Sequence, residues 1–200
     1  MKRVLVAESG QKPLIELDEI SELTPIPSRS IIQMKIKATF QSKEGSKIFQ
    51  TYYDEADLVG ISDERDFDGS HAFCFLEDQL VLVHHPKDGW MPPGGSAEPG
   101  ELYTETTERE VKEETNMKVL YQELIGYSIF ERPDKIIKQT RVMCIVEKIG
   151  EFVSDPDGEI MEIMLIDPND YKQYFDWGEA GDRIMQKAIE LKEKWNKKPD

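Results

Sequence analysis

Residues 95–117 read GSAEPGELYTETTEREVKEETNM, and the rest of the chain is best interpreted outward from this stretch. Residues 102–115 contain neither Gly nor Pro, which predicts one uninterrupted helix. On that helix Glu110, Glu113 and Glu114 lie at i, i+3 and i+4, so their side chains project from one face. Like charges so close repel one another unless a cation lies between them, and hard ions such as Mg²⁺ take oxygen ligands. The stretch therefore predicts either a cation site or a solvated acidic helix face.

The residues on either side of the acidic cluster favour the cation site. Residues 90–95, of sequence WMPPGG, form a tight loop before the helix, and its glycines let backbone groups approach a ligand closely. Arg109 directly precedes the cluster and Glu101 lies two helical turns earlier. Both are near enough to hold the cation-binding side chains in position without binding the cation themselves.

At these positions the chain resembles the signature of the Nudix hydrolase family. In that signature a Gly is followed after five residues by Glu, and after seven more by Arg-Glu, an aliphatic residue, a spacer, Glu-Glu, a spacer, Gly and an aliphatic residue. The matching residues here are Gly95, Glu101, Arg109, Glu110, Val111, Glu113, Glu114 and Met117. Asn116 stands where the family usually has Gly. Because Asn is the commonest other residue in the left-handed conformation that ends helices, we expect the helix to end at Asn116.

The resemblance implies a set of roles for these residues. Glu110, Glu113 and Glu114 match the family's metal-binding and catalytic glutamates, and a backbone carbonyl of the glycine pair, Gly95 or the residue before it, is a further ligand. Glu101 and Arg109 match the pair that holds the loop and the helix together. The implied cofactor is Mg²⁺, with Mn²⁺ as the alternative. The implied reaction is hydrolysis of a diphosphate linkage in a nucleoside diphosphate joined to another group.

The general base and the substrate contacts stay open between alternatives. The base is either Glu114 or a glutamate of a later loop, for which Glu159 and Glu162 are the candidates; each of these two also fits a solvent-facing charge on an edge strand. The candidate substrate-binding residues are Trp90, Arg132 and Arg141. Trp90 fits a base-stacking residue as well as a core residue, and the two arginines fit phosphate ligands as well as surface charges.

Two features point to different substrates. The WMPPGG run resembles that of family members acting on nucleoside triphosphates, which favours a (d)NTP or a related, oxidised mononucleotide. Pro133 resembles a proline of ADP-ribose pyrophosphatases, which keeps ADP-ribose or a nucleotide sugar as the alternative. A non-catalytic nucleotide sensor of the same fold is disfavoured, because such modules lose signature glutamates that are present here. An mRNA-end processing enzyme is disfavoured by the strong acidity of a chain without a basic stripe.

Composition narrows the class of protein further. The formal net charge of −15 disfavours non-specific nucleic-acid binding, because phosphate backbones are held by Lys and Arg. With 38% hydrophobic residues the chain has material for a core, and it has neither a membrane-spanning stretch nor a signal peptide. Cys74 and Cys144 lie in apolar runs and are expected to be buried, reduced thiols. We expect a cytoplasmic enzyme acting on a small phosphorylated nucleotide without membrane contact.

The order of predicted elements gives an α/β fold, in which a mixed sheet lies between helices. This agrees with the α/β/α sandwich that the resemblance implies. We divide the chain into an N-terminal extension, residues 1–69, and a Nudix-type domain, residues 70–200. The extension contains a predicted hairpin at 30–53 that would serve in homodimer formation or cover the substrate. The domain has predicted strands at 72–76, 80–84, 119–130, 136–149 and 159–166, and a closing helix at 179–197.

Overall fold

The computed structural model describes residues 35–41, 45–54, 63–152, 158 and 160–197, all of which belong to one compact unit. Their strands are β1 (Lys35–Gln41), β2 (Lys47–Asp54), β3 (Gly69–Leu76), β4 (Gln79–His85), β5 (Gly89–Met91), β6 (Gly94–Ser96), β7 (Met117–Glu131), β8 (Ile136–Lys148) and β9 (Glu162–Ile166). Their helices are α1 (Tyr103–Thr115), the 3₁₀ helix η1 (Pro168–Gln173) and α2 (Gly178–Asn196).

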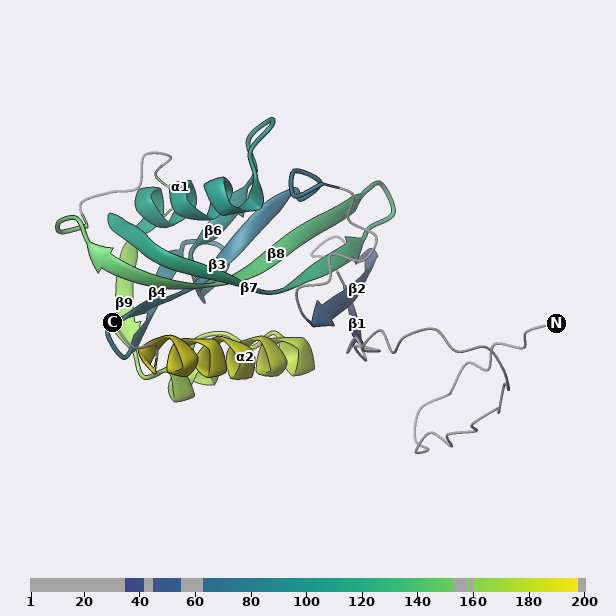
Figure 1. The fold of residues 1–200 in the computed structure, drawn as a ribbon. Coiled ribbons are helices and arrows are strands. Elements are labelled where there is room, and N and C mark those ends of the chain that lie inside the picture. The colour runs from purple at the N-terminus through teal and green to yellow at the C-terminus, as the bar shows by residue number, and fades with distance from the viewer. Residues whose placement is uncertain (1–34, 42–44, 55–62, 153–157, 159, 198–200) are drawn as a thin grey trace, which may run out of the picture. The chain divides into compact units, whose positions relative to one another are not determined.

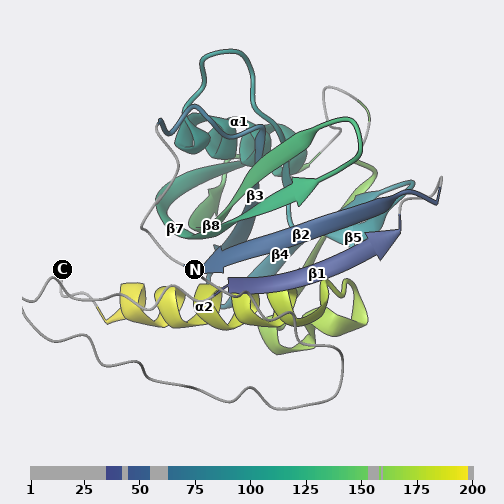
Figure 2. The ribbon, with the colours of Figure 1, turned by 90° about the vertical axis from the view of Figure 1, so that its right-hand side faces the viewer.

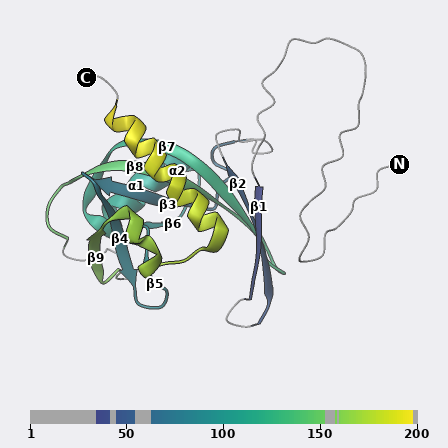
Figure 3. The same cartoon turned by 90° about the horizontal axis from the view of Figure 1, so that it is seen from below.

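The strands form one mixed sheet between the two α-helices (Figure 1). The order across the sheet is β1-β2-β7-β8-β3-β4-β5, with β6 paired to β3 and β9 paired to β4. Strands β3 and β8 run parallel, whereas the other pairs are antiparallel. Figure 3, seen from below, shows α2 running beneath the strands while α1 lies beyond them. The predicted mixed sheet between helices is confirmed.

Most predicted elements are confirmed, and one is corrected. The stretch 90–95 was expected to be a loop, yet Trp90 and Met91 belong to β5 and Gly94 begins β6. Both strands are three residues long, which is too short for a periodic pattern to show in the sequence. Their pairing is decided by partners elsewhere in the chain, such as His71 opposite Gly94.

The predicted N-terminal hairpin is present as β1 and β2, and β2 pairs with the far half of β7 (Figure 2). The expected alternation holds at Ile36, which is buried, but Phe40 is 40% exposed. Asp54, at the end of β2, is buried and accepts a hydrogen bond from Nε of Arg183 on α2 at 3.0 Å. This ion pair ties the hairpin to the helix that covers the sheet. Residues 30–34 and 42–44 of the predicted hairpin lie outside the described part of the chain.

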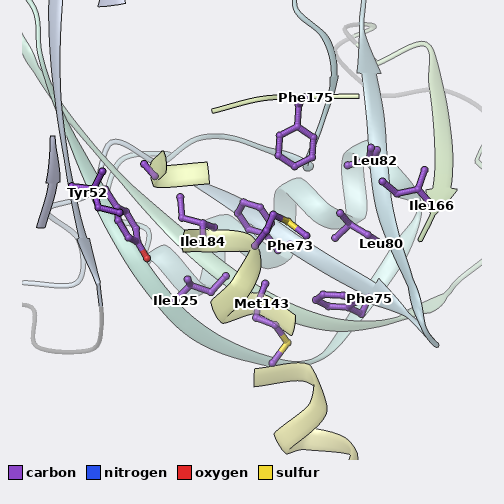
Figure 4. Packing of buried hydrophobic residues seen from close by; sticks show 14 residues of the cluster. Tyr52, Phe73, Phe75, Leu80, Leu82, Ile125, Met143, Ile166, Phe175 and Ile184 are labelled. Atoms are coloured by element: carbon purple, nitrogen blue, oxygen red, sulfur yellow. The ribbon is translucent and has the colours of Figure 1, made fainter. Parts of the chain in front are cut away.

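The core has two layers because side chains alternate across the sheet. On the α2 side, Phe73 and Phe75 of β3 pack with residues such as Ile184, as Figure 4 shows. On the α1 side, the same strand presents Ala72 and Cys74, whose smaller side chains pack against the helix. Large side chains therefore face α2 and small ones face α1.

Two further expectations concern thiols and membranes. Cys74 and Cys144 are both buried and free, and they lie opposite each other on the parallel strands β3 and β8. This confirms the expected buried, reduced thiols. Among the described residues, neither helix combines the length and the apolar character needed to cross a membrane.

Candidate active site

Helix α1 is held against the sheet and ends as the sequence predicts. Its apolar Val111 is fully buried, and Thr107 Oγ1 lies 2.7 Å from Ser70 Oγ of β3. Asn116 follows the helix with φ 53° and ψ 38°, and its backbone N–H donates to the carbonyl of Lys112. Its side-chain amide also donates to the carbonyl of Glu151 at 3.0 Å. Asn116 is therefore the left-handed end of the helix, and its side chain makes a bond that a glycine in its place would lack.

Glu101 and Arg109 join the loop to the helix. Arg109 Nε donates to Glu101 Oε1 at 2.8 Å, and its Nη2 donates to the carbonyl of Ser96 at 2.8 Å. Glu101 Oε2 accepts the backbone N–H of Glu98 at 2.8 Å and the hydroxyl of Thr106 at 2.9 Å. These hydrogen bonds, those from Arg109 foremost, lower the pKa of Glu101 to about 2. The carboxylate is thus ionised and fully engaged in fixing the start of α1.

The same arginine bridges two of the cluster glutamates. Arg109 Nη1 donates to Glu110 Oε1 at 2.9 Å and to Glu113 Oε2 at 3.1 Å. Burial raises the pKa of Glu110, and the hydrogen bond from Arg109 opposes that rise. The neighbouring carboxylates in turn raise the pKa of Arg109 well above its ordinary value, chiefly through Glu101. The repulsion expected between the glutamates is therefore balanced by one guanidinium.

The glycine pair, Gly94 and Gly95, packs closely against the carboxylates of Glu114 and Glu110. Gly94 N–H donates to Glu114 Oε2 at 2.7 Å, so β6 is bonded to the last turn of α1. A Cβ on Gly95 would lie 2.5 Å from Glu110 Oε1, and a Cβ on Gly94 would lie 2.2 Å from the carbonyl oxygen of Ser70. Position 94 therefore requires glycine, because the clash is with the backbone and φ is +152°, whereas a side chain at position 95 would displace the carboxylate of Glu110.

These groups surround one hollow of about 480 Å³. Its lining residues are Gly94, Gly95, Ser96, Ala97, Glu98, Pro99, Arg109, Glu110, Glu113 and Glu114. Among the described residues, no three acidic, His or Cys side chains stand in an arrangement that would itself hold a metal ion. The donor chemistry nevertheless fits a hard cation, because carboxylate and backbone oxygens are what such ions take. Arg109 contacts the loop through Nε and Nη2, and only its Nη1 is bonded to Glu110 and Glu113.

The other predicted site residues lie apart from this hollow. Trp90 is on β5, partly buried against the α2-side core, with its ring centroid 4.9 Å from that of His84. Arg132 is exposed in the turn between β7 and β8. Glu162 is exposed at the start of β9 and lines a different hollow, of about 410 Å³, together with Lys148 and others. Glu159 lies outside the described residues.

Arg141 departs most from its prediction. Whether as a phosphate ligand or a surface charge, it was expected to reach solvent, yet it is 3% exposed. It lies on the α2 side of β8, away from the acidic hollow, because residues 141 and 143 share one face of the strand and Met143 belongs to the α2-side core. Its position was hidden in the sequence because the register of β8 is set by strands that are distant along the chain.

Sequence reasoning missed two contributors to the site. Thr106 supports Glu101 through its hydroxyl, and the carbonyl of Ser96 accepts from Arg109. A threonine in the first turn of a helix is a weak signal, since its hydroxyl also bonds to the backbone carbonyl of Leu102. A carbonyl ligand has no sequence signal at all, because every residue carries one.

Residues 68–188, more than half of the chain, match the model of the family described as the NUDIX domain. The chain belongs to the Nudix hydrolase family. This confirms the resemblance, and at the level of the family it confirms the predicted class of pyrophosphohydrolase.

Individual Nudix relatives are distant. The chain is 29% identical over 104 residues to YtkD of Bacillus subtilis (strain 168), which is provisionally named an 8-oxo-dGTP diphosphatase; the match covers 50% of this chain and 66% of that protein. The Bacillus subtilis pyrophosphohydrolase BsRppH, in a mutant form, superposes with a TM-score of 0.59 at 21% identity, over 78% of this chain and 97% of that one. An Ap4A hydrolase of C. elegans superposes with a TM-score of 0.50 at 17% identity, over 63% and 97%. At such identities these structures share the fold with the chain, and no more follows from them.

Proposed function

We propose that the chain hydrolyses a diphosphate linkage in a nucleoside diphosphate joined to another group, with Mg²⁺ as cofactor and Mn²⁺ as an alternative. The observation that carries this proposal is the convergence of Glu110, Glu113 and Glu114 with the glycine pair on one hollow. Carboxylates paired with an arginine can also form a purely structural ion-pair network. Here they line a hollow together with the backbone of the glycine pair, which leaves room for a small charged ligand beside them.

Each residue has a distinct part in the proposed reaction. Glu110, Glu113, Glu114 and the carbonyl of Gly95 hold the cation, which supplies polarisation of the phosphoryl oxygens and lowers the pKa of the attacking water. Arg109 and Glu101 hold β6 and α1 together through the bonds of Arg109 to Glu101 and to the carbonyl of Ser96. With its anionic ligands neutralised, the hollow accepts a substrate that is itself strongly negative.

For the general base we propose Glu114 ahead of Glu162. Glu114 lines the hollow, and its Oε2 is oriented by the backbone N–H of Gly94. Glu162 lines the other hollow, together with residues such as Thr115 and Lys148. Glu159 stays a candidate from the sequence, outside the described residues.

As substrate we propose a (d)NTP or a related, possibly oxidised, mononucleotide. Support comes from the WMPPGG run and from the name of the relative YtkD. ADP-ribose or a nucleotide sugar is the second candidate, which the exposed Pro133 of the β7–β8 turn favours. A sensor without catalysis is disfavoured, since every acidic position of the signature is filled.

A substrate panel tests the proposal. The protein is incubated with nucleoside triphosphates, oxidised nucleotides, ADP-ribose, dinucleoside polyphosphates and nucleotide sugars, with Mg²⁺ or with EDTA, and the products are identified by mass. Pyrophosphate released from a triphosphate supports the first candidate, and AMP released from ADP-ribose supports the second. Tight nucleotide binding with no cleavage of any compound would replace hydrolysis by the sensor function.

For the N-terminal extension we propose a role in homodimer formation. Strand β1 is at one end of the described sheet, and Phe40 and Phe49 of the hairpin are 40% and 50% exposed. An edge strand with exposed aromatic side chains is a surface that a second copy can cover. Light scattering of the full chain and of Phe49→Lys measures the mass; a monomer in the unchanged protein contradicts this role.

A further inference from the structure

Arg141 is a buried cation without an anionic partner. Its Nη1 donates to the carbonyl of Thr140 at 2.9 Å and lies 3.5 Å from His71 Nδ1, and its Nη2 lies 3.3 Å from Gln139 Oε1. Its Nε is buried and has no hydrogen-bond partner. Among the described residues no carboxylate lies within 4.0 Å of this guanidinium. Such a charge costs free energy in the folded protein, because burial removes its hydration.

A second arginine on the same side of the sheet is paired with a carboxylate, as a buried cation usually is. Arg183 of α2 also approaches the core, and it is paired with the buried carboxylate of Asp54. Asp54 is further engaged by the hydroxyl of Tyr52 and by Lys187, so it is committed to that network. Among the buried side chains that the structure describes, the Nε–H of Arg141 is the one donor without a partner, which points to a ligand.

The walls around Arg141 are aromatic rather than charged. Its guanidinium carbon lies 5.4 Å from the ring centroid of Trp177 and 6.0 Å from that of Phe130. His71 adds no charge, because burial lowers its pKa to about 3. A phosphate site gathers several cations or backbone N–H groups, whereas one fork of donors between aromatic rings suits a flat ring with acceptor atoms.

Arg141 lies close to the surface, and its strand lies near the strand that carries the glycine pair. Trp177, Phe130, His71 and Gln139 are each partly exposed, so the guanidinium lies one side chain below solvent. The residue after Trp177 is Gly178, whose φ of +61° marks a turn before α2. In the sheet, Gly94 pairs with His71 and His71 pairs with Arg141, which places Arg141 two strand spacings, about 10 Å, from the glycine pair.

We propose that Arg141 recognises the acceptor edge of a purine base, which makes the site selective for guanine over adenine nucleotides. The proposal rests on the proposed function only in taking the substrate to be a nucleotide. The Nε and Nη2 groups form a donor fork that matches O6 and N7 of guanine, with the long Gln139 bond giving way. Adenine presents an amino group in place of O6, and a guanidinium has no acceptor to receive it. Trp177 forms the wall against which the base packs.

Binding without divalent cation tests this separately from hydrolysis. Calorimetric titration of GMP, AMP and pyrophosphate compares the unchanged protein with Arg141→Lys, which keeps the charge but loses the fork. We expect GMP to bind the unchanged protein roughly tenfold or more tightly than AMP, and Arg141→Lys to remove that preference. Arg65→Lys is the matched control, since Arg65 is exposed and pairs with Asp63; it should change neither affinity.

The outcomes separate the two proposals. Equal affinity of the unchanged protein for GMP and AMP, or no binding of either, contradicts the proposed guanine selectivity, even if the substrate panel shows hydrolysis. If the protein prefers GMP but cleaves none of the compounds, guanine selectivity is supported and the proposed hydrolysis is contradicted. If Arg141→Lys weakens pyrophosphate binding as much as GMP binding, Arg141 binds a phosphate group and the proposal is wrong. If that variant does not fold, Trp177→Ala serves in its place and should weaken GMP binding at least fivefold.

Discussion

Arg109 and Arg141 lie on opposite faces of the same sheet and have opposite surroundings. Arg109 bonds to Glu101, Glu110 and Glu113, and those contacts raise its pKa well above the ordinary value for arginine. Arg141 has no carboxylate among its contacts, and burial lowers its pKa to about 10. One cation is therefore held by excess negative charge, and the other is held by neutral hydrogen-bond acceptors and aromatic rings.

The difference separates two ways of preparing a binding site. On the α1 face the anions are in excess, and a cation from solution would complete them. On the α2 face a donor is in excess, and an acceptor from solution would complete it. The two faces therefore lack opposite kinds of partner, a cation on the α1 face and a hydrogen-bond acceptor on the α2 face.

The strongest test of the α1 face is Glu114→Gln. The amide keeps the size of the side chain but removes the charge that holds a cation and accepts a proton, so we expect Mg²⁺-dependent turnover to fall roughly a hundredfold or more. Turnover is measured by product release, and circular dichroism checks the fold. Glu108→Gln, on the exposed side of the same helix, should keep full activity. Retention of more than about a hundredth of the activity in Glu114→Gln would count against its role.

Arg109→Lys tests whether the guanidinium fork matters on this face. A lysine cannot donate to Glu101, Ser96 and Glu110 together, so the loop and helix lose their link and turnover should drop roughly tenfold to a hundredfold. The conservative change at the exposed Lys112, Lys112→Arg, should have no effect. Steady-state rates of both variants settle the point: equal rates would mean that charge alone is needed.

Asp54→Asn tests the cost of an unpaired cation on the α2 face. It removes the partner of Arg183 and should lower the free energy of unfolding by roughly 2–3 kcal/mol, because it leaves a largely buried guanidinium without an anion. Asp63→Asn breaks an exposed pair with Arg65 and should cost at most about 0.5 kcal/mol. Urea unfolding of the two variants gives the values. Equal losses would show that this face tolerates unpaired arginines, which would weaken the inference about Arg141.

The smallest effect is expected from pH acting on His71. Its pKa falls from 6.5 to about 3 in the folded protein, through burial and then the charge of Arg141. The unfolded chain therefore binds the proton first, and stability is lost as pH falls from about 6.5 towards 3. Between pH 7 and pH 5 the loss from this group should be about 2 kcal/mol, and His71→Gln should lack it. Unfolding curves at both pH values compare the two proteins; parallel losses would mean that the folded protein binds a proton at His71 as readily as the unfolded chain does.

Local patterns predicted much of this molecule. The periodic run without Gly or Pro became α1, the apolar stripe through Ile184 and Ala188 became α2, and the β-branched run became β8. Asn116 ends its helix as expected. The stretch 90–95 was misjudged, because short strands form wherever a partner is available and not where a pattern is strong.

The two arginines show where sequence information ends. Arg109 and its carboxylates come from residues 101–113, within reach of one helix and its preceding loop, so helical geometry alone brings them together. The neighbours of Arg141 come from β3, β7, β8 and the segment before α2, and only the register of the assembled sheet makes them adjacent. Contacts within one helical segment follow from its periodicity, whereas contacts between distant strands depend on which pairings the whole core permits.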